Sequence, residues 1–156
     1  MFPIRPVDSP DDLAATRALF REYADSIGVD LCFQDFETEL ATLPGAYRPP
    51  SGALLLATRG GEAAGCVALR PLEPPAVAEL KRLYVRPSAR GAGLGAALTE
   101  AALELARAAG YARIRLDTLP TMAAAQAVYR RLGFHEVAPY RLNPTPGTLY
   151  MECDLA

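Results

Sequence analysis

Hydrophobic residues recur every three to four positions in four stretches of the chain, the spacing that places them on one face of a helix. In the first of these stretches Leu13, Phe20 and Ile27 share a face. Ser9, which can cap a helix N-terminus, precedes it, and Gly28, which can adopt a left-handed backbone, follows it. The spacing predicts four helices, over residues 10–27, 33–43, 95–109 and 123–132.

Short apolar or alternating runs separate these helices and predict strands. Gly60-Gly61 can form a tight hairpin turn between two of them, and Pro71 and Pro87 are each expected to end a strand. The order is then β-α-α-β-β-β-α-β-α-β-β, which predicts a mixed α/β domain with antiparallel strands first and parallel crossovers later. The predicted strands cover residues 2–7, 54–57, 65–69, 77–85, 114–117, 134–140 and 148–153.

The bulk composition narrows the class of protein. With 156 residues, 51% of them hydrophobic, the chain suits one globular domain over residues 1–156. The net charge of −2 argues against nucleic-acid binding. Since no signal-peptide pattern or bilayer-length apolar run is found, we expect a cytoplasmic protein without membrane contact. Cys32, Cys66 and Cys153 are expected to be buried thiols, and His135 lacks neighbours at ligand spacing, so no metal site is predicted.

The turn between the fourth predicted strand and the third predicted helix is rich in glycine. Gly91, Gly93 and Gly95 would let a ligand approach the backbone, and the helix N-terminus behind them offers unsatisfied N–H donors. Arg90 adds a full positive charge. The turn therefore predicts a site for a phosphate or pyrophosphate, against the plainer interpretation of a simple loop. The basic residues that precede it are Lys81, Arg82 and Arg86.

Two other phosphate-binding motifs fit this turn less well. A Walker loop needs Lys followed by Ser or Thr where alanines occupy residues 96–97. A loose dinucleotide fingerprint fits residues 91–96, with Asp117 as the ribose-binding acid. However, residues 86–90 separate the strand from the first glycine, and too little chain follows for a doubly wound sheet.

Together these residues resemble the GCN5-related N-acetyltransferase (GNAT) family, in a bacterial subgroup of unknown substrate. Arg90, Gly93 and Gly95 fill the family's signature, which is Gln or Arg, two residues, Gly, one residue, and then Gly or Ala. Residues 83–87 resemble the strand before it. Residues 129–134 resemble the Tyr-x-x-x-Gly-Phe ending of a later family helix. The resemblance implies the acyl-CoA N-acyltransferase fold, a splayed mixed sheet of about seven strands flanked by about four helices.

The resemblance also implies how acetyl-CoA, the co-substrate, would be held without a metal. The pantetheine arm would bond to the backbone of Leu83, Tyr84 and Val85, which would also supply an N–H for the oxyanion near Tyr84 or Val85. Met122 stands where the family often has an asparagine on this arm. The pyrophosphate would rest on the turn formed by Arg90, Gly91, Ala92, Gly93, Leu94, Gly95 and Ala96.

Two residues are candidates for proton transfer. The resemblance gives Tyr129 the position of the general acid that protonates the CoA thiolate, which favours function over the plainer interpretation of a core tyrosine on a helix face. Glu79 is the candidate base, acting directly or through water. Its competing interpretation is an edge-strand charge paired with Lys81 or Arg82.

The leading hypothesis is an enzyme that transfers acetyl to a primary amine of a small molecule by direct attack in a ternary complex. A protein N-terminal or lysine acetyltransferase and a non-catalytic acyl-CoA sensor remain open, as does a homodimer. A mixed aromatic and basic acceptor site would suit an amine that also carries a carboxylate. Its expected residues are Arg21, Tyr23, Phe33, Phe36, Tyr140, Arg141 and Asn143.

Overall fold

A single mixed sheet organises the chain in the computed structural model, which describes residues 2–28 and 35–155. Seven strands are found there, in the order β1-β2-β3-β4-β5-β7-β6. Only β4 and β5 pair in parallel. The predicted mixed α/β class and element order are confirmed. The strands are β1 (Ile4–Pro6), β2 (Ala53–Arg59), β3 (Glu62–Glu73), β4 (Val77–Val85), β5 (Arg113–Thr118), β6 (His135–Val137) and β7 (Leu149–Asp154).

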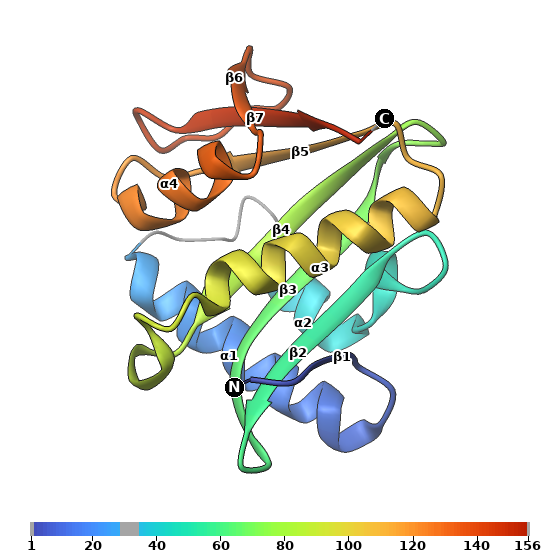
Figure 1. The fold of residues 1–156 in the computed structure, drawn as a ribbon, viewed down its shortest axis with the longest axis vertical. Coiled ribbons are helices and arrows are strands. Elements are labelled where there is room, and N and C mark those ends of the chain that lie inside the picture. The colour runs from blue at the N-terminus through green and yellow to red at the C-terminus, as the bar shows by residue number, and fades with distance from the viewer. Residues whose placement is uncertain (1, 29–34, 156) are drawn as a thin grey trace.

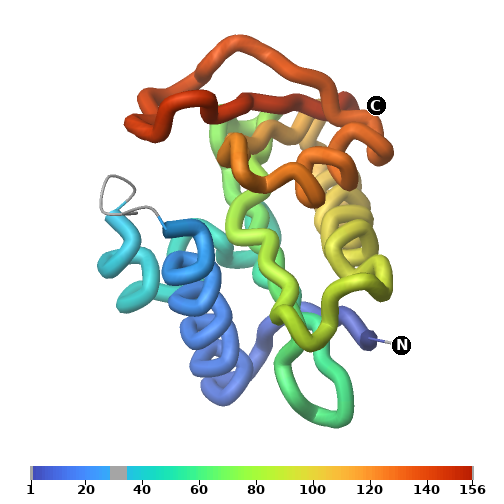
Figure 2. The backbone as a smooth tube through the Cα atoms, turned by 90° about the vertical axis from the view of Figure 1, so that its left-hand side faces the viewer, coloured from blue at the N-terminus to red at the C-terminus, as the bar shows by residue number. Residues whose placement is uncertain are grey.

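Helices cover both faces of the sheet (Figures 1 and 2). On one face lie α1 (Pro10–Ile27) and α2 (Phe36–Thr42), and on the other lie α3 (Leu94–Ala108) and α4 (Ala123–Arg131). Each pair covers its own buried apolar cluster, and the alternation of side chains along the strands supplies both clusters. The domain is therefore a three-layer arrangement with two cores.

The boundary signals of the first helix act as predicted. Ser9 caps α1 by accepting a hydrogen bond from the backbone N–H of Asp12, and Gly28 follows the helix with a φ of 67°. The Gly60-Gly61 turn between β2 and β3 also has positive φ at both residues. These signals can be predicted from the sequence because each residue acts only on the backbone next to it.

Several predicted boundaries differ from the structure, three of them as follows. β3 continues through Pro71, which lies opposite Ala78, and a register shift between Pro71 and Glu73 accommodates the residue that lacks an N–H. The strand predicted over residues 134–140 shortens to β6, which ends at Val137, two residues before Pro139. The second helix begins at Phe36, and residues 33–34 of its predicted range lie outside the described residues.

The sheet splays between its two parallel strands. β4 pairs with β5 only over Val77–Glu79, opposite Arg113–Arg115. Farther along, β4 continues its pairing with β3, while β5 continues with β7, so the two strands separate (Figure 1). This opening is the V-shaped gap that the family resemblance implied, and it positions the site.

Candidate active site

A β-bulge interrupts β4 just after it leaves β5. Lys81 lies opposite Ala68 and Tyr84 lies opposite Cys66, so three residue steps on β4 match two on β3. Arg82, in the middle, has a φ of 60°, which is uncommon for a residue with a side chain. The extra residue lets the consecutive side chains of Lys81 and Arg82 both reach the same cavity.

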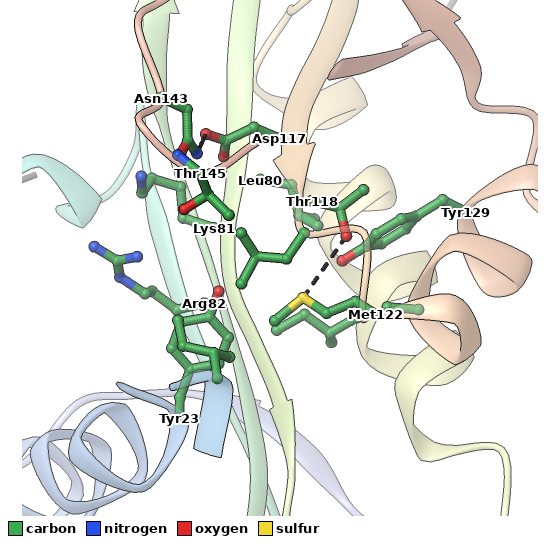
Figure 3. Close-up of a pocket in the computed structure, with 14 residues that line it drawn as sticks. Tyr23, Leu80, Lys81, Arg82, Asp117, Thr118, Met122, Tyr129, Asn143 and Thr145 are labelled. Atoms are coloured by element: carbon green, nitrogen blue, oxygen red, sulfur yellow. Dashed lines mark hydrogen bonds between the residues drawn. The ribbon is translucent and has the colours of Figure 1, made fainter. Parts of the chain in front are cut away.

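The cavity lies where β4 and β5 separate and has a volume of about 50 Å³ (Figure 3). Its walls come from α1, β4, the end of β5 with the segment after it, α4, and the segment around residues 143–145. Space of this size holds about four water-sized groups, enough for reacting groups rather than whole substrates. The lining residues are Tyr23, Ile27, Leu80, Lys81, Arg82, Leu83, Asp117, Thr118, Leu119, Met122, Ala125, Tyr129, Asn143 and Thr145.

Tyr129 combines the two interpretations that its sequence position left open. Its ring is buried in the core on the α3 side and packs against Phe134, with the ring centroids 5.5 Å apart. Its hydroxyl points toward the cavity, beside Met122 and Thr118 (Figure 3). Burial raises the pKa of this hydroxyl, so it keeps its proton at neutral pH.

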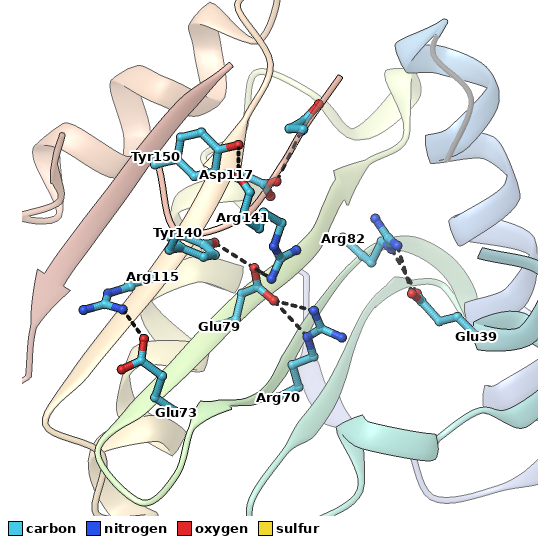
Figure 4. A network of polar contacts seen from close by, with 11 residues as sticks. Glu39, Arg70, Glu73, Glu79, Arg82, Arg115, Asp117, Tyr140, Arg141 and Tyr150 are labelled. Carbon is cyan, nitrogen blue, oxygen red and sulfur yellow. Dashed lines mark hydrogen bonds and ion pairs between the residues drawn. The ribbon is translucent and has the colours of Figure 1, made fainter. Parts of the chain in front are cut away.

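Three side chains hold the carboxylate of Glu79, namely Arg70, Tyr140 and Arg141 (Figure 4). Its Oε1 accepts from Arg70 Nε at 2.8 Å, and its Oε2 accepts from the Tyr140 hydroxyl at 2.7 Å and pairs with Arg141. The side chain is fully buried in a central strand, so the edge-strand interpretation is wrong. Burial raises its pKa, but the positive charges of Lys81, Arg141 and Arg70 outweigh this and lower it overall. Glu79 is thus a fixed anion that is absent from the residues lining the described cavity.

Arg82 is also neutralised within the protein. Its guanidinium donates to both oxygens of Glu39, at 2.9 and 2.8 Å, and lies over the rings of Phe36 and Tyr23. Burial lowers its pKa, but the hydrogen bond to Glu39 and its negative charge raise it overall, so the arginine stays charged. This pair ties α2 to the bulge of β4.

Asp117 lies at the end of β5, on the far side of the opening from Arg82. It is half-buried, lines the cavity, and accepts a hydrogen bond from Asn143 Nδ2 at 3.3 Å. Asn143 is fixed in turn because its Oδ1 accepts from the backbone N–H of Thr145 at 2.9 Å. The cavity therefore contains a positioned carboxylate of its own.

The end of β4 is connected to the first helix. Glu22 of α1 accepts from the Tyr84 hydroxyl at 3.2 Å and forms an ion pair with Arg86 at 2.7 Å. Arg90 turns back, and its Nε donates to the backbone carbonyl of Val85 at 2.9 Å. The strand segment that the resemblance assigned to the pantetheine arm is thus anchored at its far end.

The glycine-rich turn has the geometry of an anion cradle. Gly91 and Gly93 have φ values of 88° and 78°, and Gly93 precedes α3 without a side-chain cap on the helix N-terminus. Gly95 lies inside the helix, where a Cβ would meet no atom within 4 Å. Because packing in the described residues does not require glycine there, the open face suits a close ligand. Backbone N–H donors at a helix N-terminus fit a pyrophosphate.

The residues expected to bind the acceptor separate into groups. Tyr23 and Asn143 line the cavity, whereas Tyr140 and Arg141 hold Glu79 beside it. Arg21 is exposed and pairs with Glu37, Phe36 is buried in the core, and Phe33 lies outside the described residues. The sequence prediction did not include Lys81, Arg82 or Thr145. The signal in the sequence was the pair of consecutive basic residues, Lys81 and Arg82, inside a buried strand. The bulge of β4 brings both side chains to the cavity.

Three further observations concern the cysteines, metal ligands and apolar helices of the chain. Cys66 and Cys153 are buried thiols, as predicted, and Cys32 lies outside the described residues. Across residues 2–28 and 35–155, no group of three His, Cys, Asp or Glu side chains is arranged to hold a metal ion. In the same residues, no helix has the length and apolar character needed to cross a membrane.

Comparisons with known proteins agree with this geometry. The model of the acetyltransferase (GNAT) family matches residues 14–134. The chain belongs to the GNAT family. An uncharacterized N-acetyltransferase of Schizosaccharomyces pombe is 40% identical over 154 residues, covering 98% of this chain and 94% of the relative. This GNAT protein is therefore an acyl-CoA N-acyltransferase, and the predicted splayed fold is confirmed.

Two other GNAT proteins extend the comparison. Aminoglycoside N(6')-acetyltransferase type 1 of Klebsiella aerogenes is 32% identical over 150 residues, covering 92% of this chain and 95% of the relative. The crystal structure of an acyl-CoA N-acyltransferase from Klebsiella pneumoniae is 29% identical, with a TM-score of 0.74, and the match covers 100% of this chain and 99% of that one. The similarity extends beyond the motifs between residues 83 and 134 to nearly the full length.

Proposed function

We propose that this GNAT protein acetylates the primary amine of a small molecule by direct attack on acetyl-CoA in a ternary complex. The observation that carries the proposal is the cavity at the opening of the sheet, because it joins two sides with different chemistry. Tyr129 reaches it from the α4 side, and Tyr23 and Arg82 line it on the α1 and α2 side. Donor and acceptor can thus approach it from opposite faces.

Acetyl-CoA supplies an activated acetyl thioester when bound. We assign its pyrophosphate to the turn from Arg90 to Ala96, whose N–H donors and open Gly95 fit an anion. We assign the pantetheine arm to the backbone of Leu83, Tyr84 and Val85, beyond the point where β4 pairs with β5. An N–H near Tyr84 or Val85 would then stabilise the oxyanion. The carbonyl of Val85 already accepts from Arg90, and Tyr84 and Val85 pair with β3 on one side, which leaves the side of the segment that faces the opening for the arm.

Tyr129 is the proposed general acid. Its raised pKa keeps the hydroxyl protonated, and its position in the cavity allows proton donation to the departing sulfur. Direct attack is favoured over an acetyl-cysteine route because burial raises the pKa of the Cys66 thiol to about 12, and neither Cys66 nor Cys153 lines the cavity. Glu79, held by three partners, is assigned to positioning Tyr140 and Arg141.

The acceptor is proposed to be a small amine that Asp117 anchors through its ammonium group. Aminoglycosides, the substrates in the name of one relative, are small polyamines and support this class. The expected carboxylate on the acceptor loses support, because Arg82 and Arg141 are each paired with a carboxylate of the protein. A protein acetyltransferase and an acyl-CoA sensor become outcomes of the test.

The test is thiol release from acetyl-CoA with panels of small amines, amino acids and peptides. We expect turnover with a small amine, with intersecting initial-rate lines that report a ternary complex. Asp117→Asn should raise KM for that amine about tenfold with little change in KM for acetyl-CoA. Turnover with peptides alone would identify a protein acetyltransferase, and acetyl-CoA binding without any turnover would identify a sensor.

A further inference from the structure

Acetyl transfer to an amine needs a proton acceptor, since an ammonium nitrogen has no electron pair with which to attack. Glu79 is a poor candidate because its oxygens are occupied by Arg70, Tyr140 and Arg141 and its pKa is lowered. The proton acceptor must line the cavity, change its charge near neutral pH, and lie on the acceptor side of the sheet.

Lys81 is singular in the sequence. Of the 16 lysine and arginine residues, 15 are arginines, and Lys81 is the single lysine of the chain. Arginine keeps its proton throughout the physiological range, whereas a buried lysine can lose it. Lys81 is thus the one residue among the lysines and arginines that can lose its proton, and it is buried in the cavity wall.

The position of Lys81 suits an acceptor-side base. Across the sheet its strand partner is Ala68, which belongs to the core cluster covered by α1 and α2. Tyr129 belongs to the opposite cluster, covered by α3 and α4. Figure 3 shows the two side chains on opposite sides of β4. Both line the cavity. An amine arriving beside Lys81 would meet an acetyl group whose sulfur departs toward Tyr129.

The charges around Lys81 come from several elements. Arg82 on the same strand and Arg70 on β3 disfavour its ammonium form, whereas Glu79 and Asp117 favour it. Tyr23 of α1, Tyr129 of α4 and the Asn143–Thr145 segment complete the surrounding wall. Burial is the largest influence and, with the positive neighbours, lowers the pKa of Lys81 to about 7. A substantial neutral fraction is then present at physiological pH.

We propose that Lys81 is the general base of the reaction, a role that rests on the proposed function. Its neutral Nζ takes one proton from the acceptor ammonium held near Asp117. The freed nitrogen forms a bond to the acetyl carbon, and the carbon–sulfur bond breaks with its electron pair on sulfur. Tyr129 gives its proton to the sulfur and regains one from the acetylated nitrogen through solvent. Lys81 then releases its proton to solvent.

The first experiment reads the charge of Lys81 directly and needs no acceptor. Protein grown with lysine carrying carbon-13 at the ε position gives one lysine signal by NMR, because the chain has one lysine. We expect this signal to titrate with a midpoint about 7. The matched control is Arg107→Lys, which adds a lysine on the exposed part of α3 and should give a second signal near the ordinary value of about 10.4. A Lys81 midpoint near that ordinary value would overturn the proposal.

The second experiment uses the amine that the wild-type enzyme turns over best. Lys81→Arg keeps the positive charge and Lys81→Met keeps the apolar stem, and neither variant can accept a proton. Both should lose about 100-fold or more in kcat while their Kd for acetyl-CoA stays within about twofold. Thermal melting checks that each variant is folded, and the Arg107→Lys control should keep full activity.

The outcomes separate the two proposals. Wild-type activity in either folded Lys81 variant would exclude Lys81 as the base while leaving the acetyltransferase function intact. An absence of turnover with every small amine would reject the proposed acceptor class, and the NMR midpoint would still decide whether Lys81 can act as a base at neutral pH.

Discussion

Both halves of β4 carry buried charged residues, but those of the second half line the cavity and Glu79 in the first half does not. In the first half, Val77–Glu79, the strand is paired with β3 on one side and β5 on the other, and the charge of Glu79 is fixed by three partners. In the second half the strand is paired with β3 alone, it bulges at Arg82, and it forms a wall of the cavity. The position relative to the splay decides which charged side chains reach the cavity, and the residue type decides whether such a side chain can lose its charge.

The pKa directions express the same contrast. Glu79 and Lys81 lie two residues apart, and each is buried. Burial raises the pKa of Glu79, but surrounding cations reverse the effect and keep the carboxylate charged. Burial lowers the pKa of Lys81, and the neighbouring arginines add to the effect. The cluster is thus rich in positive charge, which stabilises the anion at Glu79 and destabilises the cation at Lys81.

The largest expected effect tests the first half of β4, which is paired with a strand on each side. Glu79→Gln should destabilise the protein by about 3–5 kcal/mol, because Arg70 and Arg141 would lose their buried counter-ion. Chemical denaturation measures the change. The control Glu104→Gln removes an exposed pair with Arg107 and should change stability by less than about 1 kcal/mol. A stable Glu79→Gln protein with a large loss of kcat would instead restore Glu79 as the base.

The next effect tests the cavity. Tyr129→Phe should lower kcat about 100-fold through the loss of the proton donor while leaving KM for acetyl-CoA nearly unchanged. The ring packing against Phe134 is preserved, so stability should change little. Tyr111→Phe is the matched control, since Tyr111 is also buried but donates to the Ser51 carbonyl away from the cavity. Equal rates in the two variants would remove Tyr129 from the mechanism.

A smaller effect concerns the pH dependence of stability. Lys81 has a folded-state pKa of about 7, below its ordinary value, so the unfolded chain binds more protons between about pH 7 and pH 10. Its contribution to the free energy of unfolding should therefore rise with pH, by about 2 kcal/mol between pH 7 and pH 9. Lys81→Met should lack this rise. Comparing the two proteins cancels the titration of the cysteines, and identical pH profiles would show that Lys81 keeps an ordinary pKa.

Much of the fold could be predicted because its signals are local. The cap at Ser9, the stop at Gly28 and the bounds of β4 follow from neighbouring residues alone. Pro71 was misread because whether a strand tolerates proline depends on its partner strand, and β4 accommodates it through a register shift. The motif residues predict the donor side of the site in the same local way.

The partners of Glu79 could not be predicted. They come from β3 and from residues 140–141, which lie 61 and 62 positions farther along the chain, and only the folded sheet brings them together. Lys81 was missed for a related reason, since strict alternation does not place Lys81 and Arg82 at one cavity. A bulge is needed, and it becomes visible only in the pairing of β4 with β3.

The smallest expected effect concerns the glycine-rich turn at residues 90–96, which lies outside both halves of β4. The family signature accepts alanine at position 95, so the test uses the larger Gly95→Leu. Its Cβ would meet no protein atom, and leucine is a better helix former than glycine by about 0.5–1 kcal/mol. We therefore expect stability to stay equal or to rise, while KM for acetyl-CoA rises about tenfold because the leucine side chain would occupy the proposed pyrophosphate position. Glu100→Ala, at an exposed position farther along α3, should leave KM unchanged. A folded Gly95→Leu enzyme with normal KM would mean that the pyrophosphate binds elsewhere, since the open face of the turn would then have no ligand to accommodate.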